Sequence, residues 1–268
     1  MTRTAVLICP GRGTYNKPEL GYLHRHHAEK SALFAGFDAA RAALGQEEVT
    51  VLDGATRFAV SKYSRGDVAS PLIYASALAD AQSLAEDIEV VAVTGNSMGW
   101  YIALAAAGAL APQDGFELVN TMGSLMQEHL IGGQLVYPFC GADWRADPAR
   151  KAELLALVAE INAREGHVLA LSIDLGGMLV LAGDEAGLVA FEAAVPVVEE
   201  RFPMRLANHA GFHTGLQEPV AQEGRARLDG SKLRQPQVPL IDGRGAIWQP
   251  GACDLAALWG YTLGHQVV

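Results

Sequence analysis

The feature that most constrains this chain is a strand, a sharp glycine turn and a helix that follow one another without a gap. Residues 89–94 (EVVAVT) form a short apolar run, which is typical of a buried strand. GNSMG follows at 95–99, and an alanine-rich helix is expected over 100–107. Glycines on both sides of a serine fit a turn too tight for side chains, with the hydroxyl exposed at the helix N-terminus. This G-x-S-x-G pattern predicts that Ser97 is a nucleophile.

Strands and helices alternate over the first half of the chain, which predicts an α/β fold. A β-branched run at 4–9 ends in the loop PGRG at 10–13, and helical spacing follows at 28–44 and 70–84. Because the strands are continuous apolar runs, we expect them to be buried in a parallel sheet. With the serine turn, this predicts a large α/β-hydrolase-like domain.

A second pattern begins at the glycine pair 132–133. From there the expected order is strand, helix, strand, strand, helix, strand, at 134–139, 148–164, 167–174, 178–182, 184–195 and 202–207. That order is the one of a ferredoxin-like subdomain. We therefore predict a ferredoxin-like insert over 132–207, within a large catalytic domain formed by 1–131 and 208–268.

A serine nucleophile needs hydrogen-bond donors for the oxyanion that forms when it attacks a carbonyl. The helix after Ser97 begins with backbone N–H groups that have no partner inside the helix, so the N–H of Met98 is one expected donor. Parallel strands end at the same edge of a sheet, which places the loop at 10–13 beside the serine turn. The glycines of that loop permit a close approach of its backbone, and the second donor is expected there.

The nucleophile also needs a base, and the chain has eight histidines. His213 is favoured, because a glycine separates an expected strand from a helix-like stretch there, and such loops present side chains to ligands. His209 is the alternative, whereas the three histidines within 24–27 fall in a polar loop and are expected to be solvated. To orient the imidazole, Asp242 and Asp254 are available, and a backbone carbonyl would serve the same purpose.

Charge and cysteine content exclude several classes of protein. The chain has 20 lysines and arginines against 30 aspartates and glutamates, a formal charge of −10, which disfavours nucleic acid as a partner. The most apolar window, 103–111, is too short to span a membrane, and Pro10 comes too early for a secretory signal, so we expect a cytoplasmic protein. Three scattered cysteines without a CxxC pair predict neither a disulfide framework nor a metal site.

Several motifs together resemble the malonyl-CoA:acyl-carrier-protein transacylases and the acyltransferase domains of fatty-acid and polyketide synthesis. CPGRGT at 9–14 resembles the family's FPGQGS, GNSMGWY at 95–101 resembles GHSLGEY, and AAGAL is kept at 106–110. GSLMQ at 123–127 resembles the R-G-x-x-M-Q helix, and AGFH at 210–213 resembles the segment F-H-S-x-x-M-x-P. The matches follow the family's order and span most of the chain.

The resemblance implies an acyl-carrier-protein S-malonyltransferase-like acyltransferase, whose substrates are an acyl-CoA and acyl carrier protein. Ser97 would take the acyl group from CoA, and His213 would act first as base and then as acid. The carrier-protein thiol would then attack the acyl-serine. The backbone N–H groups of Met98 and Arg12 would form the oxyanion hole. The family uses the CoA thioester as substrate and implies no cofactor and no metal.

Departures from the family's motifs bear on the acyl group. Met122 stands where malonyl-specific members have an arginine, whose planar fork binds the free carboxylate bidentately. Either the acyl group is uncharged, or another cation such as Arg12 has taken over. Asn96 replaces a histidine before the nucleophile, and Asp174 stands where the family often has asparagine. With Gly11 and Met122, these two are the expected substrate-binding residues.

Two other functions stay open. A serine acyl hydrolase or thioesterase would use water as acceptor. The chain order of such a triad is serine, aspartate and histidine, and the sequence meets it with Ser97, Asp242 or Asp254, and His265. A non-catalytic subunit that binds carrier protein is favoured by the lost arginine and by the family's continuation beyond 261–268, but opposed by the intact Ser97 and His213. Malonyl is the leading acyl group, and the pathway and oligomeric state stay open.

Overall fold

The computed structural model describes residues 2–264. The chain divides into two compact units: 2–127 with 224–263 form the larger unit, and 128–223 form the body of the smaller unit. The sequence placed the domain boundaries at 131/132 and 207/208, and that assignment stays a prediction. In the division by contacts, the segment that contains His213 is grouped with the smaller unit.

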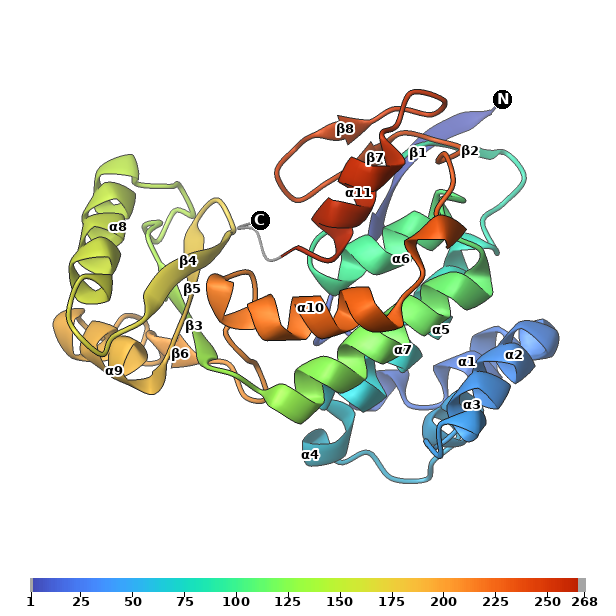
Figure 1. Cartoon of the computed structure of the whole chain (residues 1–268), viewed down its shortest axis with the longest axis horizontal. Coiled ribbons are helices and arrows are strands. Elements are labelled where there is room, and N and C mark those ends of the chain that lie inside the picture. Colours follow the sequence, from blue (N-terminus) through green and yellow to red (C-terminus); the bar gives the residue numbers. More distant parts are fainter. Residues whose placement is uncertain (1, 265–268) are drawn as a thin grey trace. The chain divides into compact units, whose positions relative to one another are not determined.

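The larger unit contains a four-stranded sheet with the strand order β1-β2-β7-β8 (Figure 1). Its strands are β1 (Arg3–Cys9), β2 (Ile88–Gly95), β7 (Leu240–Ile241) and β8 (Ile247–Trp248). β1 and β7 both run parallel to β2, and β8 is antiparallel to β7. The register pairs Cys9 with Gly95, so the loops after β1 and β2 leave the sheet at the same edge. A mainly parallel sheet is thus confirmed, and it brings both glycine loops to one edge. The prediction that its strands are buried is wrong for β1, where Val6 is 51% and Ile8 75% exposed.

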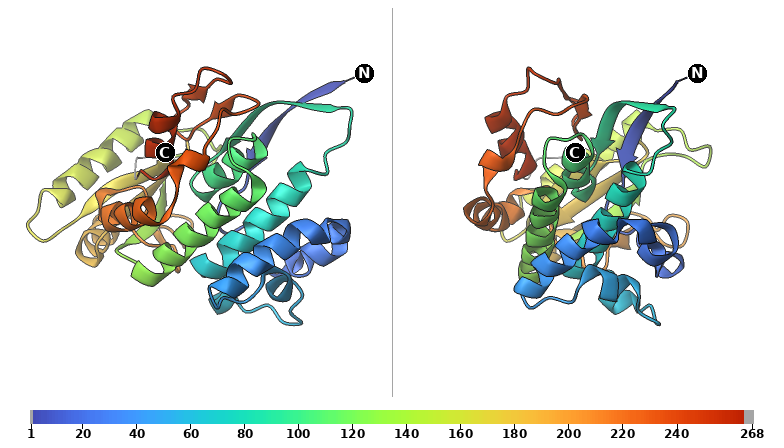
Figure 2. Two further views of the ribbon diagram at one scale, coloured as in Figure 1. Left: turned by 45° about the vertical axis from the view of Figure 1, so that its right-hand side comes forward. Right: turned by 90° about the vertical axis from the view of Figure 1, so that its right-hand side faces the viewer.

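Helices supply the rest of the larger unit (Figure 2). They are α1 (Tyr22–His26), α2 (Ser31–Ala43), α3 (Val49–Asp53), α4 (Val60–Tyr63), α5 (Gly66–Ala81), α6 (Met98–Ala106) and α11 (Leu255–Thr262), while α7 (Pro112–His129) and α10 (Glu218–Arg227) each contain a boundary between the two units. α6 contacts β1 and β2, and α5 contacts α6. Within the described part of the chain, no helix combines the length and the apolar character needed to cross a bilayer.

Helix α5 begins earlier than its proline suggests. The sequence predicted helical spacing over 70–84, but the helix starts at Gly66 and contains Pro71 in its second turn. Proline has no N–H, so it cannot donate to the carbonyl four residues before it, at Asp67. The Arg41 guanidinium donates to that carbonyl oxygen at 3.0 Å instead. A buried side chain thus replaces the missing backbone hydrogen bond, which lets the helix continue.

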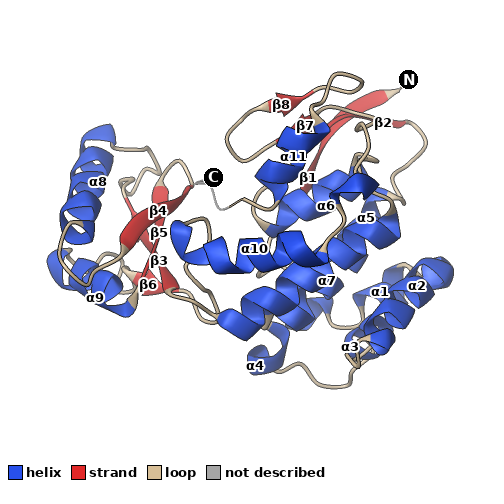
Figure 3. Cartoon of the chain, viewed as in Figure 1, coloured by secondary structure: helices blue, strands red, loops and turns tan. Residues whose placement is uncertain are grey.

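The smaller unit has an antiparallel sheet with the strand order β4-β5-β3-β6 (Figure 3). Its elements are β3 (Gly133–Pro138), α8 (Pro148–Asn162), β4 (Leu169–Asp174), β5 (Met178–Gly183), α9 (Glu185–Ala194) and β6 (Met204–Arg205). The two helices contact each other and bury apolar side chains in one core with the strands. The predicted order of strands and helices is confirmed, and the last strand is shorter than the predicted 202–207.

Candidate active site

Ser97 lies at the sharp turn between β2 and α6. Its backbone torsions are φ 56° and ψ −125°, a combination that residues with a side chain rarely adopt. Such torsions cost on the order of 1–3 kcal/mol and persist only where the surroundings impose them. The N–H of Gly99 donates to the Asn96 carbonyl at 2.9 Å, and the N–H of Trp100 donates to the Ser97 carbonyl at 3.0 Å. The turn therefore runs directly into the helix and keeps the serine at its N-terminus.

Gly95 and Gly99 pack so closely that neither position has room for a side chain. A Cβ atom on Gly95 would lie 2.1 Å from the carbonyl oxygen of Gly99. A Cβ atom on Gly99 would lie 2.5 Å from the carbonyl oxygen of Cys9, at the end of β1. Both distances are well below van der Waals contact, so only glycine fits. Backbone packing against β1 thus imposes the strained turn on Ser97.

The loop after β1 lies beside this turn. A Cβ atom on Gly11 would be 3.6 Å from the carbonyl oxygen of Asn96, which is ordinary contact distance. The structure therefore brings Gly11 and Asn96 together, and the two proposed oxyanion donors, Arg12 and Met98, belong to the same two segments. Their role as donors stays a prediction.

The side chain of Arg12 extends to the junction between α4 and α5. Its Nη2 donates to the carbonyl oxygen of Ser64 at 2.8 Å. Burial lowers the pKa of the guanidinium, and the carboxylate of Asp67 partly opposes this effect. Binding of an acyl carboxylate by Arg12 stays a prediction.

Met122, at the position of the family's arginine, is buried in α7 with 3% of its surface exposed. A Cβ atom on Gly224 of α10 would lie 2.6 Å from its sulfur, so the thioether occupies the space that Gly224 leaves. A flexible, apolar side chain is suited to filling such a gap. The predicted part of Met122 in substrate binding is untested by these contacts.

His213 lies in a segment of the smaller unit that contains two left-handed residues. Asn208 has φ 57° and His213 has φ 59°. The N–H of Gly211 donates to the Ile131 carbonyl at 2.7 Å, and the hydroxyl of Thr214 donates to the Gly211 carbonyl at 2.6 Å. These bonds hold the segment on both sides of His213, whose role as base stays a prediction.

Two buried polar residues beside this segment are absent from the predicted site. Gln134 of β3 is 3% exposed and Ser172 of β4 is fully buried. The Gln134 Nε2 lies 2.7 Å from the Ser172 Oγ, which in turn donates to the Phe212 carbonyl at 2.8 Å. The Gln134 Oε1 lies 2.9 Å from Nδ1 of His209. A polar residue inside an otherwise apolar strand was the available signal, since such groups are buried only with partners.

Asp174 has structural partners within the smaller unit. Its carboxylate forms an ion pair with Lys151 and accepts from the N–H of Gly176 at 3.0 Å. Burial raises the pKa of Asp174, but the bonds from Lys151 and Gly176 outweigh it and lower the pKa overall. The carboxylate is therefore stabilised in its charged form by its own hairpin, and its predicted contact with substrate is untested.

The two aspartates that could orient an imidazole are also engaged. Asp242 accepts from the side chains of Arg244, at 2.6 Å, and Trp248, at 3.1 Å. Asp254 caps the N-terminus of α11, where it accepts from the N–H of Ala257. The third member of the alternative hydrolase triad, His265, lies outside the described residues.

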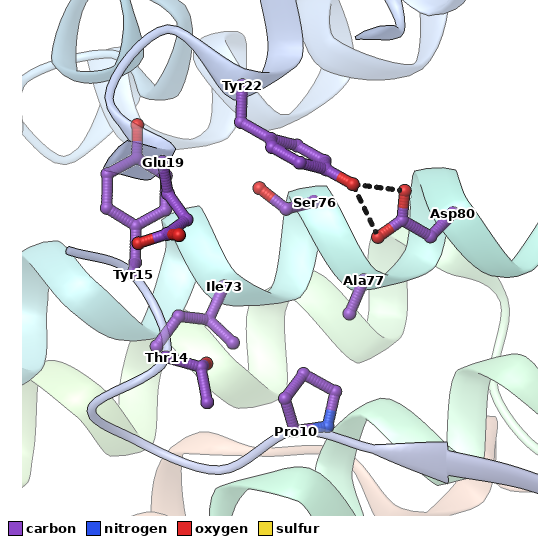
Figure 4. A pocket seen from close by; sticks show the side chains of 9 residues that line it. All are labelled: Pro10, Thr14, Tyr15, Glu19, Tyr22, Ile73, Ser76, Ala77 and Asp80. Carbon is purple, nitrogen blue, oxygen red and sulfur yellow. Dashed lines mark hydrogen bonds between the residues drawn. The ribbon is translucent and has the colours of Figure 1, made fainter. Parts of the chain in front are cut away.

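A cavity of about 190 Å³ lies in the larger unit, next to the start of the first loop (Figure 4). It is lined by Pro10, Thr14, Tyr15, Glu19, Tyr22, Ile73, Ser76, Ala77 and Asp80, which differ from the predicted site residues. The Asp80 carboxylate accepts from the Tyr22 hydroxyl at 3.0 Å and lies 2.7 Å from Nε2 of His27. The prediction that His27 is solvated is wrong: it is 4% exposed, because Asp80 gives its ring a buried polar partner.

Two known proteins resemble the chain in sequence over somewhat more than half of its length. It is 32% identical over 155 residues to a non-reducing polyketide synthase of Cercospora nicotianae, which covers 58% of this chain and 7% of that protein. It is 29% identical over 157 residues to the malonyl CoA-acyl carrier protein transacylase of Bacillus subtilis (strain 168), covering 57% of this chain and 46% of that protein. The matches thus span less than half of these relatives. No protein-family model matches the chain.

Solved structures resemble the whole fold. The malonyl-CoA:acyl carrier protein transacylase of Xanthomonas oryzae pv. oryzae has a TM-score of 0.74 at 22% identity, covering 100% of this chain and 81% of that chain. A transacylase of Burkholderia pseudomallei has a TM-score of 0.75 at 20% identity, covering 100% and 85%. A malonyl-transacylase solved with its type II polyketide acyl-carrier protein has a TM-score of 0.75 at 20% identity, covering 99% and 81%. The predicted resemblance is confirmed.

Proposed function

We propose that this chain, a relative of the malonyl-CoA:acyl carrier protein transacylases and the acyltransferase domains of polyketide synthases, transfers an acyl group from CoA to acyl carrier protein through an acyl-serine. The observation that carries the proposal is the backbone of Ser97. A serine held at φ 56° and ψ −125° between a strand and a buried helix fits the nucleophile turn of α/β-hydrolase-like domains. Strain of this kind is typical of reactive sites.

In the first half-reaction, the Ser97 Oγ attacks the thioester carbonyl and gives its proton to the imidazole of His213. The carbonyl electrons move to oxygen, where the backbone N–H groups of Met98 and Arg12 stabilise the negative charge. The intermediate then expels the CoA sulfur, which takes the proton back from the imidazolium. The product is an ester between the acyl group and Ser97.

The second half-reaction reverses these roles. The thiol of acyl carrier protein gives its proton to His213 and attacks the ester carbonyl. The same backbone N–H groups stabilise the second oxyanion, and the Ser97 oxygen leaves with the proton from His213. This sequence uses one base twice, once for each acceptor, as covalent catalysis by serine requires.

Malonyl is the acyl group that we propose first, because malonyl transacylases are among the relatives. A malonate carboxylate removed from water requires a cation. Met122 carries no charge, so we assign this role to the guanidinium of Arg12, on the segment beside the Ser97 turn. Asn96 and Gly11 would contact the acyl group from the same neighbourhood.

The smaller unit belongs to the same proposal as a ferredoxin-like subdomain. The strand order β4-β5-β3-β6, with α8 and α9 in one core with the sheet, supports this assignment. In this assignment the subdomain covers 132–207, and His213 lies on the segment that follows its last strand.

Intact-mass measurement after brief mixing with malonyl-CoA, acetyl-CoA or a longer acyl-CoA tests the proposal. We expect a malonyl adduct that disappears in Ser97→Ala and persists in Ser61→Ala, an exposed serine of α4. Arg12→Ala keeps the backbone N–H and removes only the side chain, so it should lower malonyl loading and leave acetyl loading unchanged. No adduct with any thioester would overturn the proposal in favour of a carrier-binding subunit.

The acceptor is tested by the fate of the adduct. Holo acyl carrier protein, which carries the thiol, should remove the malonyl group from Ser97 and gain its mass, whereas the apo form should not. Loss of the adduct in buffer at the same rate would instead identify a hydrolase that uses water.

A further inference from the structure

We propose that Gln134 and Ser172 are positioning residues for His213, and that they act through the peptide group that joins Phe212 to His213. The inference rests on the proposed function, in which the imidazole of His213 moves the proton. Its structural basis is the hydrogen-bonded chain from His209 through Gln134 and Ser172 to the Phe212 carbonyl.

The donor and acceptor in each of these hydrogen bonds follow from the group at the end of the row, the Phe212 carbonyl. A carbonyl oxygen can only accept, so the Ser172 hydroxyl must donate to Phe212, at 2.8 Å. The Ser172 oxygen then accepts from the Gln134 amide, whose Nε2 also lies 3.5 Å from the Phe212 carbonyl. With its nitrogen turned toward Ser172, Gln134 presents its Oε1 to Nδ1 of His209, which donates. Turning the amide over would set its oxygen against the Phe212 oxygen, so one arrangement is favoured.

The Phe212 carbonyl belongs to the same planar peptide group as the backbone nitrogen of His213. Bonds to that oxygen therefore fix the plane from which the His213 φ angle is measured. That angle is 59°, in the left-handed region, which is unfavourable for a residue with a Cβ atom. Ser172 and Gln134 supply bonds that offset this cost, and the angle sets the direction in which the imidazole leaves the backbone.

Ser172 can reach the carbonyl because β4 is irregular at that residue. Leu171 pairs with Leu181 and Ile173 pairs with Val180, so the register shifts between Leu171 and Ile173, around Ser172. A bulge of this kind re-aims a side chain that regular alternation would direct elsewhere. Gln134 starts from the neighbouring part of the same sheet, opposite Ala182 of β5.

Burial makes these bonds difficult to replace by water. Ser172 is fully buried, and Gln134 nearly so. Without the Ser172 hydroxyl, the buried Phe212 carbonyl keeps only the longer contact from the Gln134 amide out of these two donors, so we expect the peptide to rotate toward a better partner. The left-handed angle of His213 would change with it, and a displacement of about 1 Å can cost about 100-fold in rate.

Single-turnover acylation of Ser97 by malonyl-CoA tests the proposal in Ser172→Ala. We expect the acylation rate to fall about 10-fold to 100-fold, with an unchanged KM for acyl-CoA. Ser172→Thr keeps the hydroxyl and should recover most of the rate. The matched control is Val158→Ala, which removes buried apolar contacts from α8 and should lower Tm without changing the rate. Equal slowing in Val158→Ala at equal loss of Tm would overturn the proposal.

Ser172→Ala in a His213→Ala background separates positioning of the imidazole from a non-specific structural effect. Residues that act through one group are non-additive, so Ser172→Ala should have no further effect once the imidazole is gone. If Ser172→Ala slows acylation equally in both backgrounds, the two residues do not act through His213 and the proposal fails.

Failure of the underlying function would be seen separately. The proposed function alone would be overturned if the wild-type protein formed no adduct. The same holds if His213→Ala acylated Ser97 as fast as the wild type does. Nuclear magnetic resonance of histidine labelled with nitrogen-15 then tests positioning without activity. Ser172→Ala should shift the backbone amide and imidazole signals of His213, and Val158→Ala should not. Unchanged His213 signals in Ser172→Ala would overturn the inference.

Discussion

Ser97 and His213 have almost the same unusual backbone angle, φ 56° and φ 59°, but the two units impose it by different means. At Ser97, backbone packs directly on backbone, and the glycines at 95 and 99 are required because no side chain fits. At His213, the hydroxyl of Ser172 and the amide of Gln134 bind the preceding peptide group. A strained residue held by glycines tolerates almost no change around it, whereas one held by side chains can be altered one hydrogen bond at a time.

The largest effect should come from Gly99→Ala. The new Cβ atom would meet the Cys9 carbonyl oxygen at 2.5 Å, so β1 or α6 must shift. We expect the free energy of unfolding to fall by about 3 kcal/mol or more, as measured by urea denaturation. Gly260→Ala is the control: nothing lies within 4 Å of its new Cβ atom, and it should be neutral or slightly stabilising. Similar stabilities of the two variants would disprove the backbone-packing account.

High pH should weaken the larger unit through Cys9, next to the Ser97 turn. Burial of this thiol, 5% exposed, raises its pKa from 9.0 to about 12. The unfolded chain releases the proton first, so the stability present below pH 9 is lost as pH rises toward 12. We expect a loss of about 2 kcal/mol by about pH 10.5. Burial also raises the pKa of Tyr15 and Tyr74, which adds to the slope.

The contribution of Cys9 is isolated by Cys9→Ala. Thermal unfolding followed from pH 8 to pH 11 should show a shallower decline in this variant than in the wild type. Gln134 and Ser172 do not ionise between pH 8 and pH 11, so their hydrogen bonds to the Phe212 carbonyl should be unaffected. An identical decline in Cys9→Ala would contradict the assignment.

Ser97→Gly should stabilise the protein modestly while it removes the nucleophile. Glycine adopts positive φ angles freely, so the substitution relieves the strain at φ 56°. We compare it with Ser97→Ala, which also lacks the hydroxyl but keeps the Cβ atom. The glycine variant should be more stable than the alanine variant by about 1 kcal/mol, measured by urea denaturation. An alanine variant of equal or greater stability would mean that the turn stores no strain.

Asp174→Asn should have the smallest effect. Asp174 and Lys151 are each about one-third exposed, and ion pairs of that kind contribute about 0–1 kcal/mol. The amide keeps an oxygen for the Gly176 N–H. Because the pKa of Asp174 is lowered in the folded protein, its contribution is present above pH 3.8 and lost as pH falls below. The free energy of unfolding, measured by denaturation at pH 7 and at pH 3, should differ slightly less between the two pH values in the variant than in the wild type. A loss above about 2 kcal/mol would mean that Asp174 contributes more to stability than such an ion pair does.

The sequence predicted the Ser97 side of the site well, because glycine leaves a direct signal. A tight turn against another backbone permits only one residue type, and the apolar run before it predicted β2 to within a residue at either end. The alternating elements of the smaller unit were likewise predictable from their apolar spacing.

The His213 side was less predictable, because its support comes from residues far apart in the chain. Gln134 and Ser172 are 38 residues apart, and each is a lone polar residue in an apolar strand. Whether such a residue faces the core depends on register and on the bulge at Ser172, which single-strand patterns do not encode. The burial of His27 was missed for the same reason, since its partner Asp80 lies 53 residues away.

The position of β2 in its sheet affects when the serine turn can form during synthesis. β2 lies between β1 and β7, and the hydroxyl of Thr94 donates to the Ile241 carbonyl across 147 residues. Before Leu240 has been synthesised and has left the ribosome, the nascent chain already contains the whole GNSMG turn. It still lacks β7, which is one of the two neighbours of β2. Contacts of such long sequence separation form slowly, because a large loop must close first. We therefore expect β2, the strand that leads into the serine turn, to pair with β7 late, after all strands of the smaller unit have been synthesised.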